Sequence, residues 1–368
     1  MTPPVIIGGG PAGTAAAAVI AAAGHPVTVI ERNAGPADKM CGDFLSGGAV
    51  AALRTLGIDP LSCGAAPLLT IRLVHRGTVA EAPLPFPAFG LSRRSLDEAL
   101  LQAAAQRGAQ IRRGLAVRGV ETTAAGFILR TASEESLSAR TVFLANGKHD
   151  LRRLARPRHA DGLLALKMYF DLAPDQQAEL HGGIELMLLN GGYAGLQRVE
   201  NNRAVLCMLV PATRYRRAGG RWDSLLAELC REVPLLERRL TGAVACLAQP
   251  LAIAGTPYGH LYRPPRGAPR GLFRLGDQAC VVPSFAGDGV AIALHSGMDA
   301  AAAWLRGDDA RRYHADLVRH ALTPMRCASL LHAVCRSPAA QPLIAAACRS
   351  WPAMLRAAAS LTRVARAA

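Results

Sequence analysis

The sequence of 368 residues predicts an α/β fold that carries an inserted β-sheet and ends in helices. Three observations support this prediction. Residues 5–32 run as apolar strand, glycine-rich turn, alanine-rich helix and second apolar strand. Residues 163–210 hold consecutive strand-like runs with glycine and asparagine turns between them. From residue 309 onward, apolar residues recur at helical spacing.

The glycine-rich turn has the spacing of a dinucleotide-binding motif. Gly8, Gly10 and Gly13 follow the first strand in the order G-x-G-x-x-G, and Glu31 ends the second strand 18 residues after Gly13. Such glycines permit a tight turn, close approach of a pyrophosphate and close packing of helix on strand. The N-terminus of the helix expected from Thr14 to Ala23 favours phosphate, and Glu31 is placed to bind a ribose. We therefore predict a Rossmann-like nucleotide-binding unit.

Charge and cysteine content narrow the possible partners. The formal net charge is +15, but the arginines are scattered and aromatic residues make up only 5% of the chain, which disfavours nucleic-acid binding. The nine cysteines show no C-x-x-C spacing, so we expect no metal site. Their odd number and the absence of a signal peptide lead us to expect a reducing environment and a cytoplasmic location. No apolar stretch is long and uninterrupted enough for a membrane span, so we expect at most peripheral membrane contact.

Between the first unit and the middle of the chain, helices alternate with short strands. We expect a helix over residues 46–57, then a β-rich stretch over residues 68–79 that is closed by Pro83, Pro85 and Pro87. The next helix extends to about Gln106, and Ser95 and Glu98 have the spacing of a capping box at its start. Short strands are expected after it, at residues 109–115, 117–122 and 141–145.

The second half of the chain has a different character. A helical insert at residues 222–240 follows the consecutive strands, and residues 246–262 return to irregular β structure. A strand and turn over residues 272–277 lead to a helix that opens at Gly287-Asp288-Gly289 and runs to about Trp304. The helical tail is divided into short pieces by Pro338, Pro342 and Pro352.

This order predicts three parts. A discontinuous nucleotide-binding domain comprises residues 1–67, 90–160 and 264–308. A substrate-binding β-sheet domain comprises residues 68–89 and 161–263, and the C-terminal helical segment comprises residues 309–368. Motifs that follow the strands of such an open sheet are expected to converge on one site.

Three motifs resemble the FAD-dependent oxidoreductases of the p-hydroxybenzoate hydroxylase fold, and most closely their geranylgeranyl reductase-like branch. They are the glycine unit with Glu31 and Arg32, the segment Arg93-x-x-Leu96-Asp97, and Gly276-Asp277 with the glycines beyond it. The resemblance implies a Rossmann-like FAD-binding domain with an inserted antiparallel β-sheet substrate domain and C-terminal helices. It implies FAD as cofactor and NAD(P)H as electron donor.

The resemblance also assigns cofactor contacts residue by residue. In the family, the Asp at position 277 holds ribityl or ribose hydroxyls, the turn after it aims a helix N-terminus at the flavin pyrimidine, and Val117 is a backbone clamp on adenine. The residues expected to contact FAD are Gly8, Gly10, Pro11, Ala12, Gly13, Glu31, Arg32, Cys41, Gly42, Arg93, Val117, Gly147, Gly276, Asp277, Pro283, Gly287, Asp288 and Gly289.

Three residues are candidates for catalysis, each with a structural alternative. Lys39-x-Cys41-Gly42 resembles a segment that passes near the flavin in the reductase branch, so Cys41 is either a proton donor or a packing residue. His149 is either a general acid or a hydrogen-bonded structural histidine. Tyr193 either lines the pocket or packs within the sheet.

Two segments depart from the family patterns. Gly195, Gln197 and Arg198 stand where the reductase branch carries the Trp, Phe and Pro of its Y-x-W-x-F-P strand, which weakens the case for a long prenyl substrate. Asn146 stands where hydroxylases carry the Asp of A-D-G, which weakens the case for hydroxylase-type NADPH handling.

The resulting prediction is an FAD-dependent oxidoreductase of lipid or secondary metabolism. Its expected substrate is a small or medium hydrophobic organic molecule, free or carrier-bound, in which a carbon–carbon bond is reduced or dehydrogenated. The alternative is a monooxygenase that uses NAD(P)H and oxygen, and a distant alternative is a non-catalytic flavin-binding protein. A flavin-dependent halogenase is disfavoured because the chain lacks the W-x-W-x-I-P signature.

Overall fold

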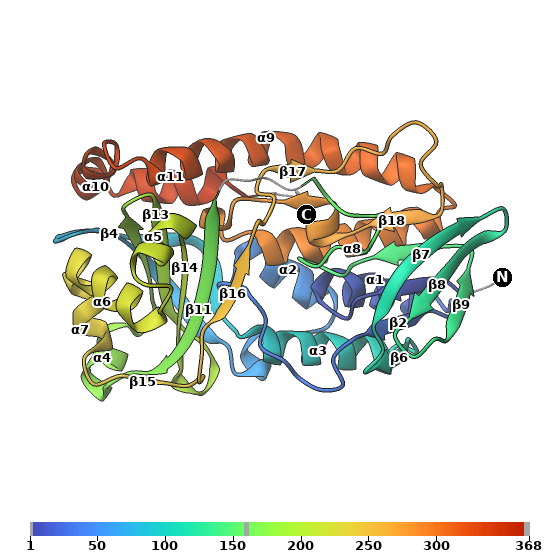
Figure 1. Cartoon of the computed structure of the whole chain (residues 1–368), viewed down its shortest axis with the longest axis horizontal. Helices are drawn as coiled ribbons and strands as arrows, with labels where there is room; N and C mark the ends of the chain where they lie inside the picture. Colours follow the sequence, from blue (N-terminus) through green and yellow to red (C-terminus); the bar gives the residue numbers. More distant parts are fainter. Residues whose placement is uncertain (1–2, 158–161, 364–368) are drawn as a thin grey trace.

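The computed structural model describes residues 3–157 and 162–363 (Figure 1). Its first part is a five-stranded parallel sheet in the order β18-β10-β1-β2-β6. The strands are β1 (Val5–Ile7), β2 (Thr28–Glu31), β6 (Gln110–Arg113), β10 (Val142–Leu144) and β18 (Leu272–Arg274). Because parallel strands end at the same edge, the motifs that follow β1, β2, β10 and β18 meet at one site, as the sequence predicts.

Four helices pack around this sheet: α1 (Pro11–Ala22), α2 (Gly47–Thr55), α3 (Arg93–Gln106) and α8 (Gly289–Leu305). The contact of α1 with α8 is the tightest. A Cβ atom added to Gly297 of α8 would lie 2.1 Å from the carbonyl oxygen of Ala12, and Ala15, Ala16 and Ala17 of α1 are fully buried. Small side chains therefore let the two helix backbones touch beneath the glycine-rich turn.

The second part is a nine-stranded sheet in the order β15-β11-β14-β13-β12-β4-β5-β3, with β16 also paired to β11. Its strands are β3 (Phe44–Leu45), β4 (Ala66–His75), β5 (Thr78–Gly90), β11 (Leu163–Asp171), β12 (Gly183–Leu189), β13 (Gly192–Arg198), β14 (Ala204–Pro211), β15 (Val244–Ala245) and β16 (Leu251–Ala254). All pairs are antiparallel except β4 with β12, so the sheet is mixed. The chain returns to the parallel sheet between β4 and β12, and this long connection allows the parallel pairing.

Smaller elements complete the two parts. A three-stranded sheet of β7 (Val117–Thr123), β8 (Gly126–Thr131) and β9 (Ser136–Ala139) flanks the parallel sheet, and β17 (His260–Leu261) pairs with β19 (Cys280–Val281). The outer helices are α4 (Pro174–Glu179), α5 (Ala212–Arg217), α6 (Trp222–Glu232) and α7 (Pro234–Leu240). Leucines of α6 and α7 are buried in the core of the nine-stranded sheet.

Three C-terminal helices lie along one side of the molecule (Figure 1): α9 (Ala310–Arg336), α10 (Gln341–Ser350) and α11 (Ala353–Leu361). The breaks between them contain Pro338 and Pro352, as predicted, whereas Pro342 lies in the first turn of α10, where a proline is tolerated. Helices α10 and α11 pack against β5 and so cover the edge of the nine-stranded sheet. Within residues 3–157 and 162–363, no helix combines the length and the apolar character needed to cross a membrane.

The structure corrects several local predictions. Strand β5 continues through Pro83, Pro85 and Pro87, which the sequence analysis took as its end; the prolines are tolerated because β5 is an edge strand for most of its length. The N-cap of α3 is Ser92, whose hydroxyl accepts the N–H of Ser95, so Ser95 is not the cap. The pair β8–β9 and the helix α4 were not predicted.

The contact between α1 and α8 yields a stability prediction. Gly297→Ala is expected to lower the free energy of unfolding by about 1–3 kcal/mol, because the added methyl group overlaps the Ala12 carbonyl. Gly35→Ala is the matched control, since a Cβ there meets no described heavy atom within 4 Å. Thermal and urea unfolding measure the difference; equal stability of the two variants would contradict the tight contact.

Candidate functional site

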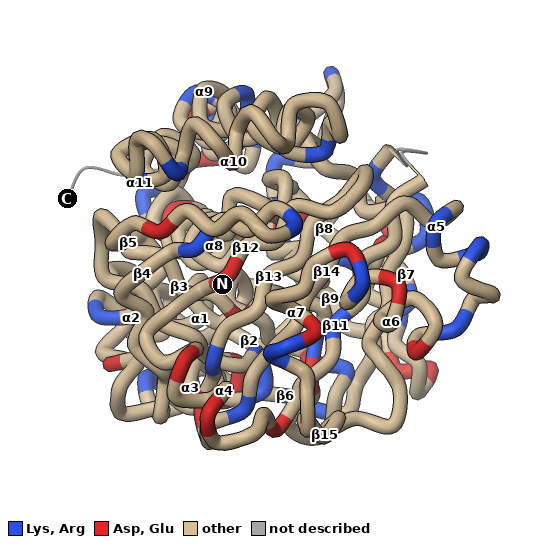
Figure 2. The backbone as a smooth tube through the Cα atoms, turned by 90° about the vertical axis from the view of Figure 1, so that its left-hand side faces the viewer, with Lys and Arg blue, Asp and Glu red and all other residues tan. Residues whose placement is uncertain are grey.

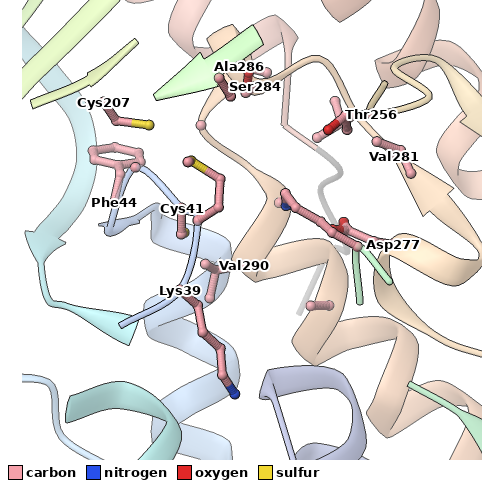
Figure 3. A pocket seen from close by; sticks show the side chains of 18 of the residues that line it. Lys39, Cys41, Phe44, Cys207, Thr256, Asp277, Val281, Ser284, Ala286 and Val290 are labelled. Carbon is pink, nitrogen blue, oxygen red and sulfur yellow. The ribbon is translucent and has the colours of Figure 1, made fainter. Parts of the chain in front are cut away.

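A cavity of about 780 Å³ lies between the parallel sheet and the nine-stranded sheet. Its walls come from the ends of β1, β2, β10 and β18, from the inner face of the nine-stranded sheet and from α9–α11. Figure 3 shows Cys41, Phe44 and Cys207 on one side of it and Thr256, Asp277 and Val281 on the other. The volume lies in the upper part of the range of about 300–1,000 Å³ that ligand pockets occupy.

The glycine-rich turn forms one end of the wall. Gly8 has a φ of +110°, and a Cβ there would lie 2.4 Å from the Ala145 carbonyl oxygen. A Cβ at Gly13 would lie 2.0 Å from the Gly8 carbonyl oxygen. Gly10 is the N-cap of α1 and has no side chain to bond the first turn, so the backbone N–H groups there are left for a ligand.

The Arg93 guanidinium lies against this turn. A Cβ at Gly10 would be 3.1 Å from Arg93 Nη2. Asp97 holds the guanidinium with two hydrogen bonds, from Nε at 2.8 Å and Nη2 at 2.9 Å, and it also accepts from Lys39 Nζ at 2.8 Å. A cation held beside the N-terminus of a helix fits the pyrophosphate of a dinucleotide.

Glu31 holds the glycine-rich turn and lines the cavity. Its Oε2 accepts the Gly9 N–H at 2.8 Å, and its Oε1 accepts the backbone N–H and side-chain amide of Asn33 at 3.1 and 2.7 Å. Each carboxylate oxygen has two lone pairs, so Oε2 retains the capacity to accept a ribose hydroxyl. The residue predicted as the ribose acceptor is therefore also an anchor of the turn.

His149 lies beside Arg32, with 2.8 Å between His149 Nε2 and Arg32 Nη2. Partial burial and the Arg32 guanidinium lower the pKa of His149, which keeps the ring neutral and able to accept from Arg32. Arg32, Val117 and His149 line the cavity near Glu31, at the end where a ribose would bind. These surroundings favour the structural alternative for His149 over the general acid.

The turns after β10 and β18 meet in an ion pair. Lys148 Nζ donates to Asp277 Oδ2 at 2.9 Å, and Arg156 Nη1 donates to the Asp277 carbonyl at 2.9 Å. Burial alone would raise the pKa of Asp277, but the Lys148 ammonium prevails and lowers it. Asp277 is therefore an anionic acceptor at the cavity wall, as required of a residue that binds ligand hydroxyls.

The N-terminus of α8 also opens onto the cavity. Gly287 has a φ of +66°, and Gly287 and Gly289 line the wall. The carboxylate of Asp288 instead accepts from Ser46 Oγ at 2.7 Å and from Arg363 Nη1 at 3.2 Å. A Cβ added to Gly289, Gly42 or Gly147 would meet no described heavy atom within 4 Å, so the backbone at these glycines faces open space.

The loop that carries Cys41 is anchored to the nine-stranded sheet by Asp43. The buried Asp43 has a φ of +55°, and its Oδ2 accepts from Lys167 Nζ at 2.6 Å and from Tyr169 Oη at 2.5 Å. Gln197 Nε2 donates to the carbonyls of Asp43 and Gly42 at 2.9 and 3.2 Å. Burial raises the pKa of Asp43, and the Lys167 ammonium opposes that shift. These bonds place Cys41 at the cavity wall (Figure 3).

Hydroxyl groups gather at one wall of the cavity. The hydroxyls of Tyr193 and Ser284 are hydrogen-bonded, and Ser284 Oγ donates to Tyr258 Oη at 3.2 Å. Burial raises the pKa of Tyr193 well above its usual value, so it remains a hydroxyl. The buried Thr256 Oγ1 has no hydrogen-bond partner among the described residues, and Thr256 lines the same cavity. We name these four residues the hydroxyl cluster.

The rest of the cavity extends as an apolar arm between the nine-stranded sheet and the C-terminal helices. The strands contribute Ile71, Leu73, Leu84, Ile184 and Leu186, and the helices contribute Leu331, Val334, Ile344, Met354 and Leu355. Gly195 lies on the wall, and a Cβ there would have ordinary contacts only, at 3.6 Å from Leu186. The space that a Trp side chain would take at this position is thus part of the cavity.

Most of the predicted site residues line this single cavity. They are Gly8, Gly10, Pro11, Ala12, Glu31, Arg32, Cys41, Gly42, Arg93, Val117, Gly147, His149, Tyr193, Gly276, Asp277, Gly287 and Gly289. Gly13, Pro283 and Asp288 are not among the described lining residues: Gly13 packs under the turn, and Asp288 faces Ser46 and Arg363.

The sequence analysis missed several residues of the cavity wall and the partners that hold the site residues. They are Lys148, Thr256, Tyr258, Ser284 and Arg363, together with Lys167, Tyr169 and Gln197 beneath the Cys41 loop. Asp43 is a further buried anchor of that loop. An isolated lysine in an apolar strand, such as Lys167, was the one local signal of such a buried pair.

Comparison with known proteins supports the same cofactor. Residues 1–160 match the family model described as an FAD binding domain. The menaquinone reductase of Mycobacterium tuberculosis (strain ATCC 25618 / H37Rv) is 28% identical over 317 residues, which cover 81% of this chain and 75% of that protein. The menaquinone reductase of Mycolicibacterium smegmatis is 27% identical over 323 residues with the same coverage.

Solved structures share the fold. The flavin-dependent brominase Bmp2 superposes with a TM-score of 0.78 at 18% identity, covering 98% of this chain and 93% of that chain. PqsL of P. aeruginosa, in complex with 2-aminobenzoylacetate, gives a TM-score of 0.74 at 20% identity and covers 90% and 95%. The chain has the FAD-binding α/β fold of p-hydroxybenzoate hydroxylase-type flavoenzymes, and it is an FAD-dependent enzyme.

The residues of this chain fit FAD. The glycine-rich turn with Arg93 suits the pyrophosphate, Glu31 suits the adenosine ribose, and Asp277 suits further hydroxyls. The N-terminus of α8, with open space at Gly289, suits the flavin pyrimidine, because a positive helix end stabilises negative charge there.

The position of Glu31 predicts its effect on cofactor affinity. Glu31→Ala is expected to weaken FAD binding by about 1–3 kcal/mol, because it removes a charged acceptor for the ribose and the anchor of the Gly9 N–H. Purified wild-type protein should be yellow, and titration of apoprotein with FAD gives both affinities. Glu121→Ala, which alters an exposed pair with Arg130, is the control and should bind FAD as wild type does. Unchanged affinity in Glu31→Ala would remove Glu31 from the ribose site.

Proposed function

We propose that this enzyme reduces or dehydrogenates a carbon–carbon bond of a hydrophobic organic substrate that carries a polar head. The observation behind the proposal is the division of one cavity into a hydroxyl cluster and an apolar arm, with Cys41 on the wall. The similarity of Lys39-x-Cys41-Gly42 to the geranylgeranyl reductase-like branch supports a reductase.

The proposed substrate class follows from the lining residues. Hydroxyls of Tyr193, Ser284 and Tyr258 both donate and accept, which suits a carbonyl or hydroxyl head group such as that of a quinone. Thr256 offers a further oxygen without a partner among the described residues. The apolar arm suits the hydrocarbon part of the same molecule, and Gly195 adds room to it. The name of the menaquinone reductases, 28% identical to this chain, agrees with a quinone-like substrate.

Bound FAD would supply hydride transfer, and NAD(P)H is the proposed electron donor. The chain's own part is positioning and proton transfer. The Cys41 loop is held by Asp43 and Gln197, so the thiol keeps a defined place at the wall. In the direction of reduction, the Cys41 thiol would donate one proton to the carbon next to the one that receives hydride, and solvent would return the proton to the thiolate. The apolar arm limits competing access of water.

The role of Cys41 is tested by two substitutions. Cys41→Ala and Cys41→Ser are each expected to lower turnover at saturating substrate by about 10²–10⁴-fold, because the thiol proton donor is lost. FAD content and reduction of the flavin by NAD(P)H should stay near wild type. Cys63→Ala, a half-buried cysteine outside the cavity lining, is the matched control. Full turnover by Cys41→Ala would leave Cys41 as a packing residue.

The type of reaction is tested by product mass. With a quinone or another unsaturated substrate and NAD(P)H, we expect a product that gains two hydrogen atoms, and the same product under anaerobic conditions. A product that gains one oxygen atom, labelled from ¹⁸O₂, would establish the monooxygenase alternative. Bound FAD without consumption of NAD(P)H on a panel of such substrates would favour the non-catalytic alternative.

A further inference from the structure

The exposed apolar residues of this chain are concentrated on its C-terminal helices. Of the ten large apolar side chains exposed in the described residues, six lie between positions 330 and 361. They are Leu330, Val334, Leu343, Trp351, Met354 and Leu361, which we name the apolar patch. Trp351 is 67% exposed and Leu343 is 73% exposed. Soluble surfaces seldom gather so many large apolar side chains, so this face is a candidate contact surface.

The members of the patch share neighbouring helix faces. Leu330 and Val334 are four residues apart on α9, and Met354 and Leu361 span seven residues at the start and end of α11. Both spacings place a pair on one stripe of its helix. Helix α10, which carries Leu343, packs against both α9 and α11, and Trp351 follows it directly.

Positive charge accompanies the patch. Residues 317–363 contain six arginines and no Asp or Glu. Arg326, Arg349 and Arg356 are exposed, and Figure 2 shows arginine segments along the C-terminal helices. This combination of exposed apolar residues, an exposed Trp and arginines without carboxylates is complementary to an anionic bilayer surface. A second copy of the chain would present the same arginines and repel.

The patch is continuous with the apolar arm. Val334 and Met354 belong to both, since they line the cavity and are 36% and 46% exposed. Leu331, Ile344 and Leu355 on the same helices line the cavity too. A molecule that leaves a lipid layer at this face would therefore meet apolar side chains from the patch into the cavity.

We propose that α9–α11 dock this protein on the surface of an anionic lipid bilayer, with the apolar patch inserted at the interface and the exposed arginines against the head groups. No helix crosses the bilayer in this arrangement, which agrees with the absence of a spanning helix among the described residues. The docking itself does not require the proposed reaction, so its test uses no turnover.

The test is cosedimentation of the FAD-loaded, full-length protein with vesicles. Vesicles of phosphatidylcholine with phosphatidylglycerol should carry the protein to the pellet, vesicles of phosphatidylcholine alone should carry much less, and high salt should weaken the binding. A blue shift of tryptophan fluorescence on binding, lost in Trp351→Phe, would place Trp351 at the interface.

Substitutions separate the contribution of the apolar patch to vesicle binding from that of the exposed arginines. Leu343→Ser with Trp351→Ser, and separately Arg349→Glu with Arg356→Glu, should each lower the affinity for anionic vesicles about tenfold or more. The controls are exposed residues on other elements, Leu61→Ser with Val244→Ser and Arg231→Glu, which should bind as wild type does. Unaltered FAD content and melting temperature show that a variant is folded.

Three results would overturn the proposal: wild-type protein that stays in the supernatant with anionic vesicles, equal binding to neutral vesicles, or binding that both patch variants retain. A dimer in light scattering that the Leu343→Ser, Trp351→Ser variant dissociates would assign the patch to a second copy and overturn it as well.

Discussion

The buried contact of Asp43 with Lys167 and Tyr169 fixes the loop that leads from the parallel sheet to the nine-stranded sheet, and the site depends on this contact. Asp43 ends the loop that follows β2 of the parallel sheet and directly precedes β3 of the nine-stranded sheet, and Lys167 and Tyr169 belong to β11 of that same sheet. All three side chains are buried, so the charged groups are removed from water. Removal of Asp43 or Lys167 would leave the other charge buried without a partner. The ion pair of Asp43 and Lys167 therefore serves mainly to position the Cys41 loop and contributes less to the stability of the fold. It fixes the Cys41 loop at the cavity wall.

The division of the site into a cofactor end and a substrate end explains which of its residues could be predicted from the sequence. The glycine-rich turn, Glu31 and the two strands that flank the turn were predicted because each depends on residues close together in the chain and on one well-defined backbone shape. Gly8 illustrates this, since only a residue without a Cβ fits its φ and its distance from Ala145. The residues expected to bind FAD could therefore be predicted from short sequence motifs.

The hydroxyl cluster is assembled from distant segments, which is why sequence reasoning found only Tyr193 among its members. Ser284 and Tyr258 become its partners through the packing of three separate loops and strands, and no spacing along the chain signals that meeting. The sequence analysis placed the end of strand β5 too early for a related reason. Its prolines oppose strand formation locally, but the edge position and the cover of α10 and α11 supply the tertiary context that allows it.

In the proposed function, chemistry and substrate choice are carried by different parts of the molecule. The cofactor end is built from the parallel sheet and from tight backbone contacts such as Gly297 with Ala12, which leave little freedom for change. The apolar arm is bounded by α9–α11, which carry the exposed patch, and α10 and α11 pack on the edge strand β5. Changes in these helices would alter substrate access while the glycine-rich turn and its cofactor contacts persist. If docking and reaction are both as proposed, the helices select a substrate from the lipid surface, and the loop held by Asp43 determines what happens to it at the flavin.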